Sequence, residues 1–138
     1  MTSALDLVDG LFQLSFQLQR TLLHIAGRHR LSLAQVRLLG ILRDREPGML
    51  ALARHLAVKK SSLSGLVHRA AQRGFVERVA SSEDGRAANV RLTAKGRRLS
   101  RVVEDEVRTA VADLVRGIPR ADRNQLAELV RRVLVSAA

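Results

Sequence analysis

The sequence predicts a mainly α-helical fold that contains one small β-hairpin. Apolar residues recur at helical spacing over most of the 138-residue chain. Two short runs, residues 75–80 and 88–93, instead alternate apolar and polar side chains, and a polar stretch around Asp84 and Gly85 separates them. We therefore expect a helical protein with one hairpin, built as a single domain that spans residues 1–138.

Two helices are expected near the start of the chain. The first covers residues 5–26, and its apolar stripe is too wide for contact with one neighbour. Ser32 is the expected N-cap of a second helix that runs to about Asp44, because GluProGly at 46–48 stops it. The first helix should therefore pack on two partners.

Two more helices are expected after the hairpin. Thr93 can cap a long helix over about 94–116, whose apolar residues have the spacing of a helix-packing seam. GlyIlePro at 117–119 breaks this helix, and a last helix covers about 120–135. The hairpin thus lies between helical regions.

Residues 50–74, LALARHLAVKKSSLSGLVHRAAQRG, predict two short helices joined by a turn. Val58 lies in the turn, Ser61 is the expected N-cap of the second helix, and Gly74 ends that helix. This pattern is typical of a helix-turn-helix, although a plain helical hairpin would also fit it. Because a β-hairpin follows directly, the order of elements favours a winged helix-turn-helix, which binds double-stranded DNA.

The second of these helices has one apolar face, formed by Leu63, Leu66, Val67 and Ala70. The lysines that precede it suit phosphates, and the serines suit phosphate or base contacts, with capping as the alternative role, above all for Ser61. The longer polar side chains could read base edges, each for roughly 1–3 kcal/mol, or contact a phosphate. The candidate DNA-binding residues are Lys59, Lys60, Ser61, Ser62, Ser64, His68, Arg69, Gln72 and, on the hairpin, Arg86.

Arg86 stands where the hairpin turns, with Asp84 and Gly85 as supporting residues. An arginine at the tip of a wing can enter the narrow, electronegative minor groove. The alternative is an ion pair with Glu83 or Asp84, which is worth little at a surface. The two roles are compatible.

The basic charge of the chain is concentrated in its middle. Residues 28–101 hold 17 basic and 5 acidic residues, whereas the flanks together hold 7 basic and 8 acidic residues. A basic block in a folded domain predicts a polyanionic partner. A solvated surface, an anionic membrane surface and a nonspecific architectural DNA-binding protein are the alternatives.

Other classes find less support in the sequence. Cysteine is absent, which excludes disulfides and thiol sensing, and the four histidines lack metal-ligand spacing, so no metal or cofactor is expected. No phosphate loop or nucleophile with a spaced base supports catalysis. Aromatic residues make up 2% of the chain, too few for the stacking that binds single strands. No apolar run approaches about 20 residues, so we expect a cytoplasmic protein associated with the nucleoid.

The run from Leu52 to Gly96 resembles the winged helix-turn-helix core of the MarR family of bacterial transcriptional regulators. The most specific part is DGRAANVRLTAKG at 84–96, which is similar to the family's wing signature. The resemblance implies a homodimer, built by residues 5–27 and 94–136, with a DNA-binding lobe over 32–93. It also implies a pseudo-palindromic operator, usually repression, and often a small aromatic or lipophilic effector.

The sequence departs from the family pattern at three points. Gly85 replaces a second wing arginine, which leaves most of the charge of the tip on Arg86. Ala71 replaces a larger apolar residue, and cysteine is absent, so the oxidation-sensing branch is excluded. The residues themselves also favour the dimer, because the first helix and the helix after Thr93 outrun a small winged domain. Terminal helices that complete a monomer core are the alternative.

Overall fold

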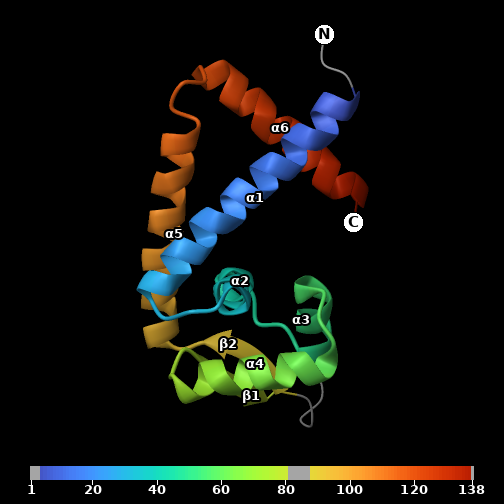
Figure 1. Ribbon diagram of the computed structural model, residues 1–138. Coiled ribbons are helices and arrows are strands. Elements are labelled where there is room, and N and C mark those ends of the chain that lie inside the picture. The colour runs from blue at the N-terminus through green and yellow to red at the C-terminus, as the bar shows by residue number, and fades with distance from the viewer. Residues whose placement is uncertain (1–3, 81–87, 138) are drawn as a thin grey trace. The chain divides into compact units, whose positions relative to one another are not determined.

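The computed structural model describes residues 4–80 and 88–137, and these form six helices and one two-stranded sheet (Figure 1). The expected fold class is confirmed. Two compact units divide the chain, Met1–Val107 and Arg108–Ala138. In chain order the elements are α1 (Ala4–Arg28), α2 (Leu33–Leu42), α3 (Met49–Leu56), α4 (Lys60–Gln72), β1 (Val76–Ala80), β2 (Ala88–Leu92), α5 (Ala94–Leu114) and α6 (Arg120–Ala137).

α2 is the central helix of the first unit. Its first turn is closed by a capping box: the Ser32 hydroxyl accepts a hydrogen bond from Gln35 N at 3.1 Å, and Gln35 Oε1 accepts one from Ser32 N at 2.9 Å. The predicted cap is thus confirmed. Leu38 and Leu39 lie in the core between the C-terminal part of α1, α4 and the sheet.

α3 and α4 form the predicted helix-turn-helix, joined by the turn at residues 57–59. Leu52 and Leu56 of α3 pack into the core with the buried face of α4. Arg37 of α2 fixes the end of α3, because its Nη1 donates a hydrogen bond to the Leu56 carbonyl oxygen at 3.3 Å. This bond satisfies a carbonyl that the helix leaves open.

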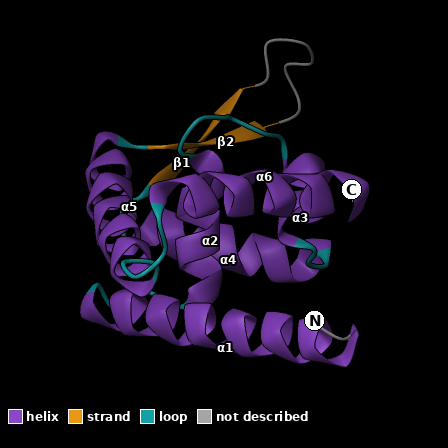
Figure 2. Cartoon of the chain, turned by 90° about the horizontal axis from the view of Figure 1, so that it is seen from above, coloured by secondary structure: helices purple, strands orange, loops and turns teal. Residues whose placement is uncertain are grey.

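The sheet is an antiparallel hairpin with Val76 opposite Leu92 and Ala80 opposite Ala88; Figure 2 shows its two strands side by side. Val76, Val90 and Leu92 are buried, so the inner face of the hairpin closes the core. Val90 N also donates to the Pro47 carbonyl oxygen at 2.9 Å, which ties the loop before α3 to β2.

The first turn of α5 packs against residues 74 and 75, which follow the end of α4. The Thr93 hydroxyl accepts from Gly96 N at 3.0 Å, as the predicted cap requires, and donates to the Gly74 carbonyl oxygen at 2.5 Å. Gly96 is buried, and a Cβ there would lie 1.9 Å from the Phe75 carbonyl oxygen. Only glycine fits this crossing without movement of the backbone.

The second unit holds α6, which has no buried residue in the described chain. On its surface, Arg131 donates two hydrogen bonds to Glu128, at 2.6 and 3.0 Å, and this contact lowers the pKa of the Glu128 carboxyl. Among the described helices, none is long and apolar enough to cross a membrane.

Candidate nucleic-acid interface

The exposed start of α4 has backbone N–H groups free for an anion. Lys59 is the N-cap, and no side chain makes a capping hydrogen bond to the first turn. Ser61 is the second residue of the helix, so its prediction as N-cap was wrong. The helix starts earlier because the Lys59 carbonyl oxygen already accepts the first helical bond, from Leu63 N at 3.0 Å. Open N–H groups at a helix start favour phosphate or another anion.

The two faces of α4 separate as the sequence predicts. Leu63, Leu66, Val67 and Ala70 are buried at 5% exposure or less, which fixes the rotation of the helix. The opposite face points away from the core. All the helix-turn-helix candidates have exposed side chains, and these are Lys59, Lys60, Ser61, Ser62, Ser64, His68, Arg69 and Gln72.

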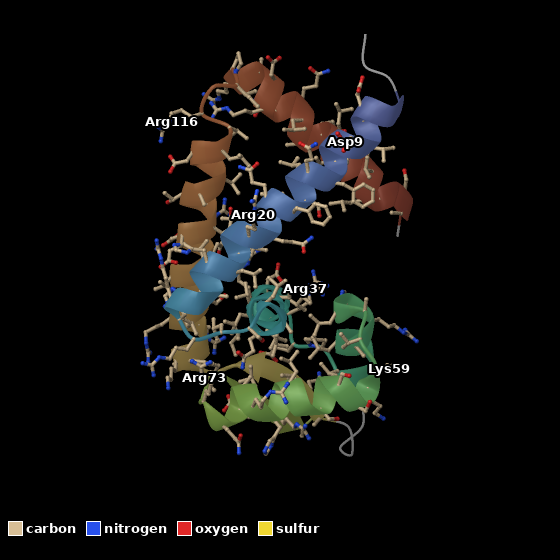
Figure 3. All side chains as sticks on the ribbon, in the orientation of Figure 1. Asp9, Arg20, Arg37, Lys59, Arg73 and Arg116 are labelled. Carbon is tan, nitrogen blue, oxygen red and sulfur yellow. The ribbon has the colours of Figure 1, made fainter. Side chains whose placement is uncertain are left out.

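These candidate side chains make no hydrogen bond or ion pair in the part of the chain that the structure describes. Their donors are therefore available to a ligand. Figure 3 shows Lys59 and Arg73 at opposite ends of α4, so the helix carries a cation at each end. The Arg73 guanidinium already donates to the carbonyl oxygens of Arg30 and His29, whereas Lys59 makes no such bond among the described residues.

Arg69 lies over Gly65, one turn before it on the exposed face. A Cβ on Gly65 would meet Arg69 Nη1 at 3.0 Å, so the missing side chain leaves room for the guanidinium. Side chains on a helix lean toward its N-terminus, which explains the direction. The guanidinium consequently lies near the middle of the exposed face.

The wing residues Asp84, Gly85 and Arg86 lie outside the described residues. Ala80 and Ala88 pair at the open end of the hairpin, where the chain enters and leaves this segment. The roles expected for these three residues stay predictions.

Sequence reasoning missed several basic residues near this face. Arg54 on α3 and Arg78 on β1 are exposed, and neither side chain has a partner in the described chain. Arg91 is exposed less and pairs across the strands with Glu77 at 2.7 Å. The paired register shows that Glu77 lies opposite Arg91, which it holds, whereas Arg78 lies opposite Val90 and is exposed at the edge of the inner face.

A polar cavity of about 360 Å³ lies in the first unit between the end of α2, β2 and the start of α5. Arg43 is paired with Glu104, Arg45 with Asp44 and Arg91 with Glu77. The cavity is therefore close to electrically balanced. Its lining residues are Leu42, Arg43, Asp44, Arg45, Glu46, Arg91, Leu92 and Arg97.

No group of three or more His, Cys, Asp or Glu side chains among the described residues could hold a metal ion. Of the histidines, His29 lies 3.1 Å from Glu106, and His55 lies 3.3 Å from Arg45. Within the described chain, each of these two histidines therefore lies beside a single partner and not in a metal-binding cluster.

Comparisons with known proteins agree with this architecture. The model of the MarR family matches residues 29–87. No curated protein sequence matches the chain. Among solved structures, the chain is similar to the transcriptional regulator PA3341, with 26% identity, a TM-score of 0.80, and coverage of 95% of this chain and 97% of that one.

Two further structures show the same fold. A MarR-family regulator from Rhodococcus sp. RHA1 has 19% identity and a TM-score of 0.80, over 96% of this chain and 97% of that chain. NadR, solved in complex with 4-hydroxyphenylacetate, has 23% identity and a TM-score of 0.78, over 95% of this chain and 92% of that chain. The family model thus matches the helix-turn-helix and the first strand, and solved structures of transcriptional regulators, one of them of the MarR family, share the fold over nearly the whole chain.

Proposed function

We propose that the protein represses transcription by binding a pseudo-palindromic operator as a homodimer. In this proposal α4 of each protomer lies in a major groove and Arg86 of each wing lies in a minor groove. The observation that carries it is the exposed face of α4, whose cationic and hydrogen-bonding side chains have no partner in the described chain. The buried face of the same helix holds these groups in a fixed direction.

The residues of α4 divide into two kinds of contact. Lys59 and Lys60, at the start of the helix, suit backbone phosphates, which position the protein without reading sequence. His68, Arg69 and Gln72 can reach base edges, where a bidentate contact is worth roughly 1–3 kcal/mol. With so few strong readers, half-site spacing and groove shape supply much of the specificity.

The dimer is supported by the apolar surface of α1. Phe12 and Phe16 are 61% and 59% exposed, with ring centroids 6.3 Å apart. Each of these side chains is about half exposed, so burying all seven on both protomers is worth roughly 10–20 kcal/mol, enough to offset an association cost of about 4–15 kcal/mol. The exposed large apolar residues of α1 are Leu7, Val8, Leu11, Phe12, Leu14, Phe16 and Leu23.

We assign residues 5–27 and 94–136 to this dimerisation region and residues 32–93 to the DNA-binding lobe. A twofold axis through the dimer would set two recognition helices about one DNA turn, roughly 34 Å, apart. The operator should therefore be an inverted repeat with that spacing.

A small aromatic effector is proposed to release the protein from DNA. The support is the similar fold of NadR, whose structure contains 4-hydroxyphenylacetate. The balanced, polar lining of the cavity beside α2 does not suit an apolar ring, so we place the effector elsewhere.

The test is selection of bound sites from random duplexes by the purified protein at about 0.15 M salt, followed by fluorescence anisotropy on the selected duplex. We expect an inverted repeat. Arg69→Ala and Arg86→Ala should each weaken binding about 10-fold or more, because each removes a contact to a groove. Arg123→Ala, which removes the same charge from α6, should bind like the wild type.

Equal affinity of the wild-type protein for unrelated duplexes would contradict this proposal. That result would favour a nonspecific architectural DNA-binding protein, which could use the same basic block.

A further inference from the structure

A second basic surface lies at the far end of α4 from the lysines, and the proposed DNA contacts do not use it. We define it by Arg30, Arg73, Lys95, Arg98 and Arg101. The residues come from three places: the turn after α1, the C-cap of α4, and the first two turns of α5. All of them lie in the first compact unit.

Direct contacts hold these places together. Arg73 donates to the carbonyl oxygens of Arg30, at 2.5 Å, and His29, at 3.1 Å. Lys95 Nζ donates to the Arg73 carbonyl oxygen at 2.9 Å. The Arg73 guanidinium and the Lys95 ammonium also lie 4.8 and 5.2 Å from the centre of the Phe75 ring. Arg30, Arg73 and Lys95 are therefore linked to one another, and Arg98 and Arg101 follow Lys95 by one and two turns of α5.

The concentration of positive charge in this surface works against stability. The first turn of α5 has no acidic residue, although the positive end of a helix dipole favours acids and disfavours cations. Arg30 has a φ of 55°, a conformation that glycine adopts at lower cost. Repulsion among the cations adds to these costs. A polyanionic partner would reverse the sign of the charge effects.

The outer members of the surface are free to bind such a partner. Arg98 and Arg101 are exposed and make no ion pair or hydrogen bond within the described residues. The nearby carboxylate of Glu106 is occupied, since it contacts His29 at 3.1 Å and Arg28 at 3.8 Å. Of the other two acids on this stretch of α5, Glu104 pairs with Arg43 at 3.0 Å, and Asp105 lies one helical turn after Arg101.

The position of the surface favours DNA over other polyanions. It is continuous with the recognition helix, because Arg73 is the C-cap of α4. α4 has 13 residues and is thus about 20 Å long, whereas the major groove is only about 12 Å wide. When the start of α4 lies in the groove, its far end reaches the backbone at or beyond the groove edge.

We propose that the second basic surface binds backbone phosphates beside the groove that α4 occupies, and so extends the footprint past the bases that are read. The inference rests on the proposed function. Arg98 and Arg101 would contact phosphates directly, and Arg73 would position the turn that carries Arg30. Phosphate contacts carry no sequence information, so this surface would add affinity and salt dependence but no specificity.

The experiment compares two duplexes: the selected inverted repeat alone, and the same repeat with about 8 base pairs added at each end. Binding is measured by anisotropy between about 0.1 and 0.3 M salt. The wild-type protein should bind the longer duplex more tightly and with a steeper salt dependence. R98A/R101A should lose that gain, roughly 10- to 100-fold at about 0.15 M salt, and its salt slope should fall by about 3–4 because a dimer loses four cations.

The matched control is R120A/R123A, which removes two charges from α6 and should retain the length-dependent gain. The selected consensus should be the same for R98A/R101A as for the wild type. Circular dichroism melting of each variant verifies folding.

If R98A/R101A retains the gain on the longer duplex while Arg69→Ala loses operator binding, the inference that the second basic surface binds phosphates is wrong, and the proposed function stands. A double variant that keeps its gain on DNA but loses binding to phosphatidylglycerol vesicles would assign the surface to a membrane and also overturn the inference. If the wild-type protein prefers no duplex sequence, the proposed function itself fails.

Discussion

At the scale of single residues, two glycines leave room for close contacts around α4 and at the start of α5. Gly65 leaves the space in which the Arg69 guanidinium lies on the exposed face. Gly96 lets the first turn of α5 cross the backbone of Phe75, and Thr93 joins the same crossing through hydrogen bonds to Gly74 and Gly96. The groups that we propose to bind DNA therefore depend on Gly65, Gly96 and Thr93, which are not among them.

Gly96→Ala should destabilise the protein strongly. The new Cβ would lie 1.9 Å from the Phe75 carbonyl oxygen, so the backbone must move; we expect a loss of about 3 kcal/mol or more, at the upper end of overpacking. Urea denaturation measures the free energy of unfolding. Gly40→Ala is the control, because nothing lies within 4 Å of its added Cβ, and it should raise stability by about 0.5–1 kcal/mol. Equal effects of the two substitutions would contradict the close crossing.

At the scale of elements, three helices of the first unit end in the same way. Just after the last turn of α1, α3 and α4 one residue has a positive φ, and a pair of hydrogen bonds reaches back over that turn. For α3, Ala57 N donates to Arg54 O at 3.2 Å and Val58 N donates to Ala53 O at 3.1 Å. Glycine occupies this position only after α4, as Gly74. A glycine in the sequence therefore predicts one of these three helix ends, the end of α4.

Ala57→Gly should stabilise the helix-turn-helix. Ala57 has a φ of 54°, and relief of the contact between its Cβ and the backbone should add about 0.5–1 kcal/mol to the free energy of unfolding. Gly74→Ala makes the reverse change at a φ of 79° and should cost about 1 kcal/mol or more. Thermal and urea unfolding of both variants test the pair. If Ala57→Gly instead lowers stability, the added conformational entropy of the unfolded chain outweighs the steric strain that is removed at residue 57 in the folded state.

At the scale of the whole molecule, the polar and the apolar surfaces lie on different helices. Within the first unit, α4 carries the exposed polar face and the start of α5 carries part of the second basic surface. α1, in the same unit, instead exposes large apolar side chains along much of its length. α6 likewise exposes Leu129, Val133 and Leu134. Apolar patches of this kind mark association sites in proteins that are soluble.

Phe12→Asp should weaken the proposed dimer. A buried carboxylate with no partner would cost several kcal/mol at the interface, in addition to the lost ring contact with Phe16. Sedimentation velocity at micromolar concentration should show a shift from dimer to monomer, and operator affinity should fall because two half-sites are no longer bound together. Gln17→Asp adds the same charge on another face of α1 and should remain dimeric. A wild-type monomer at high concentration would refute the dimer.

Local signals in the sequence determined the elements of this protein. Helical periodicity, the Ser32 and Thr93 caps and the alternation around the hairpin each depend on neighbours in the chain, and the structure confirms each of them. The apolar spacing of α4 also determined which side faces the core. Local reasoning failed at Ser61, because a lysine without a side-chain cap can still begin a helix whose surroundings are fixed by packing.

Only the tertiary structure decided what lies beside what. The second basic surface joins Arg30 to Arg73, 43 residues later, and Arg73 to Lys95, a further 22 residues on. The close crossing at Gly96 likewise depends on where α5 passes the Phe75 backbone. Such contacts form between segments far apart in the chain, so they depend on the packing of the whole core, which periodicity and capping do not specify.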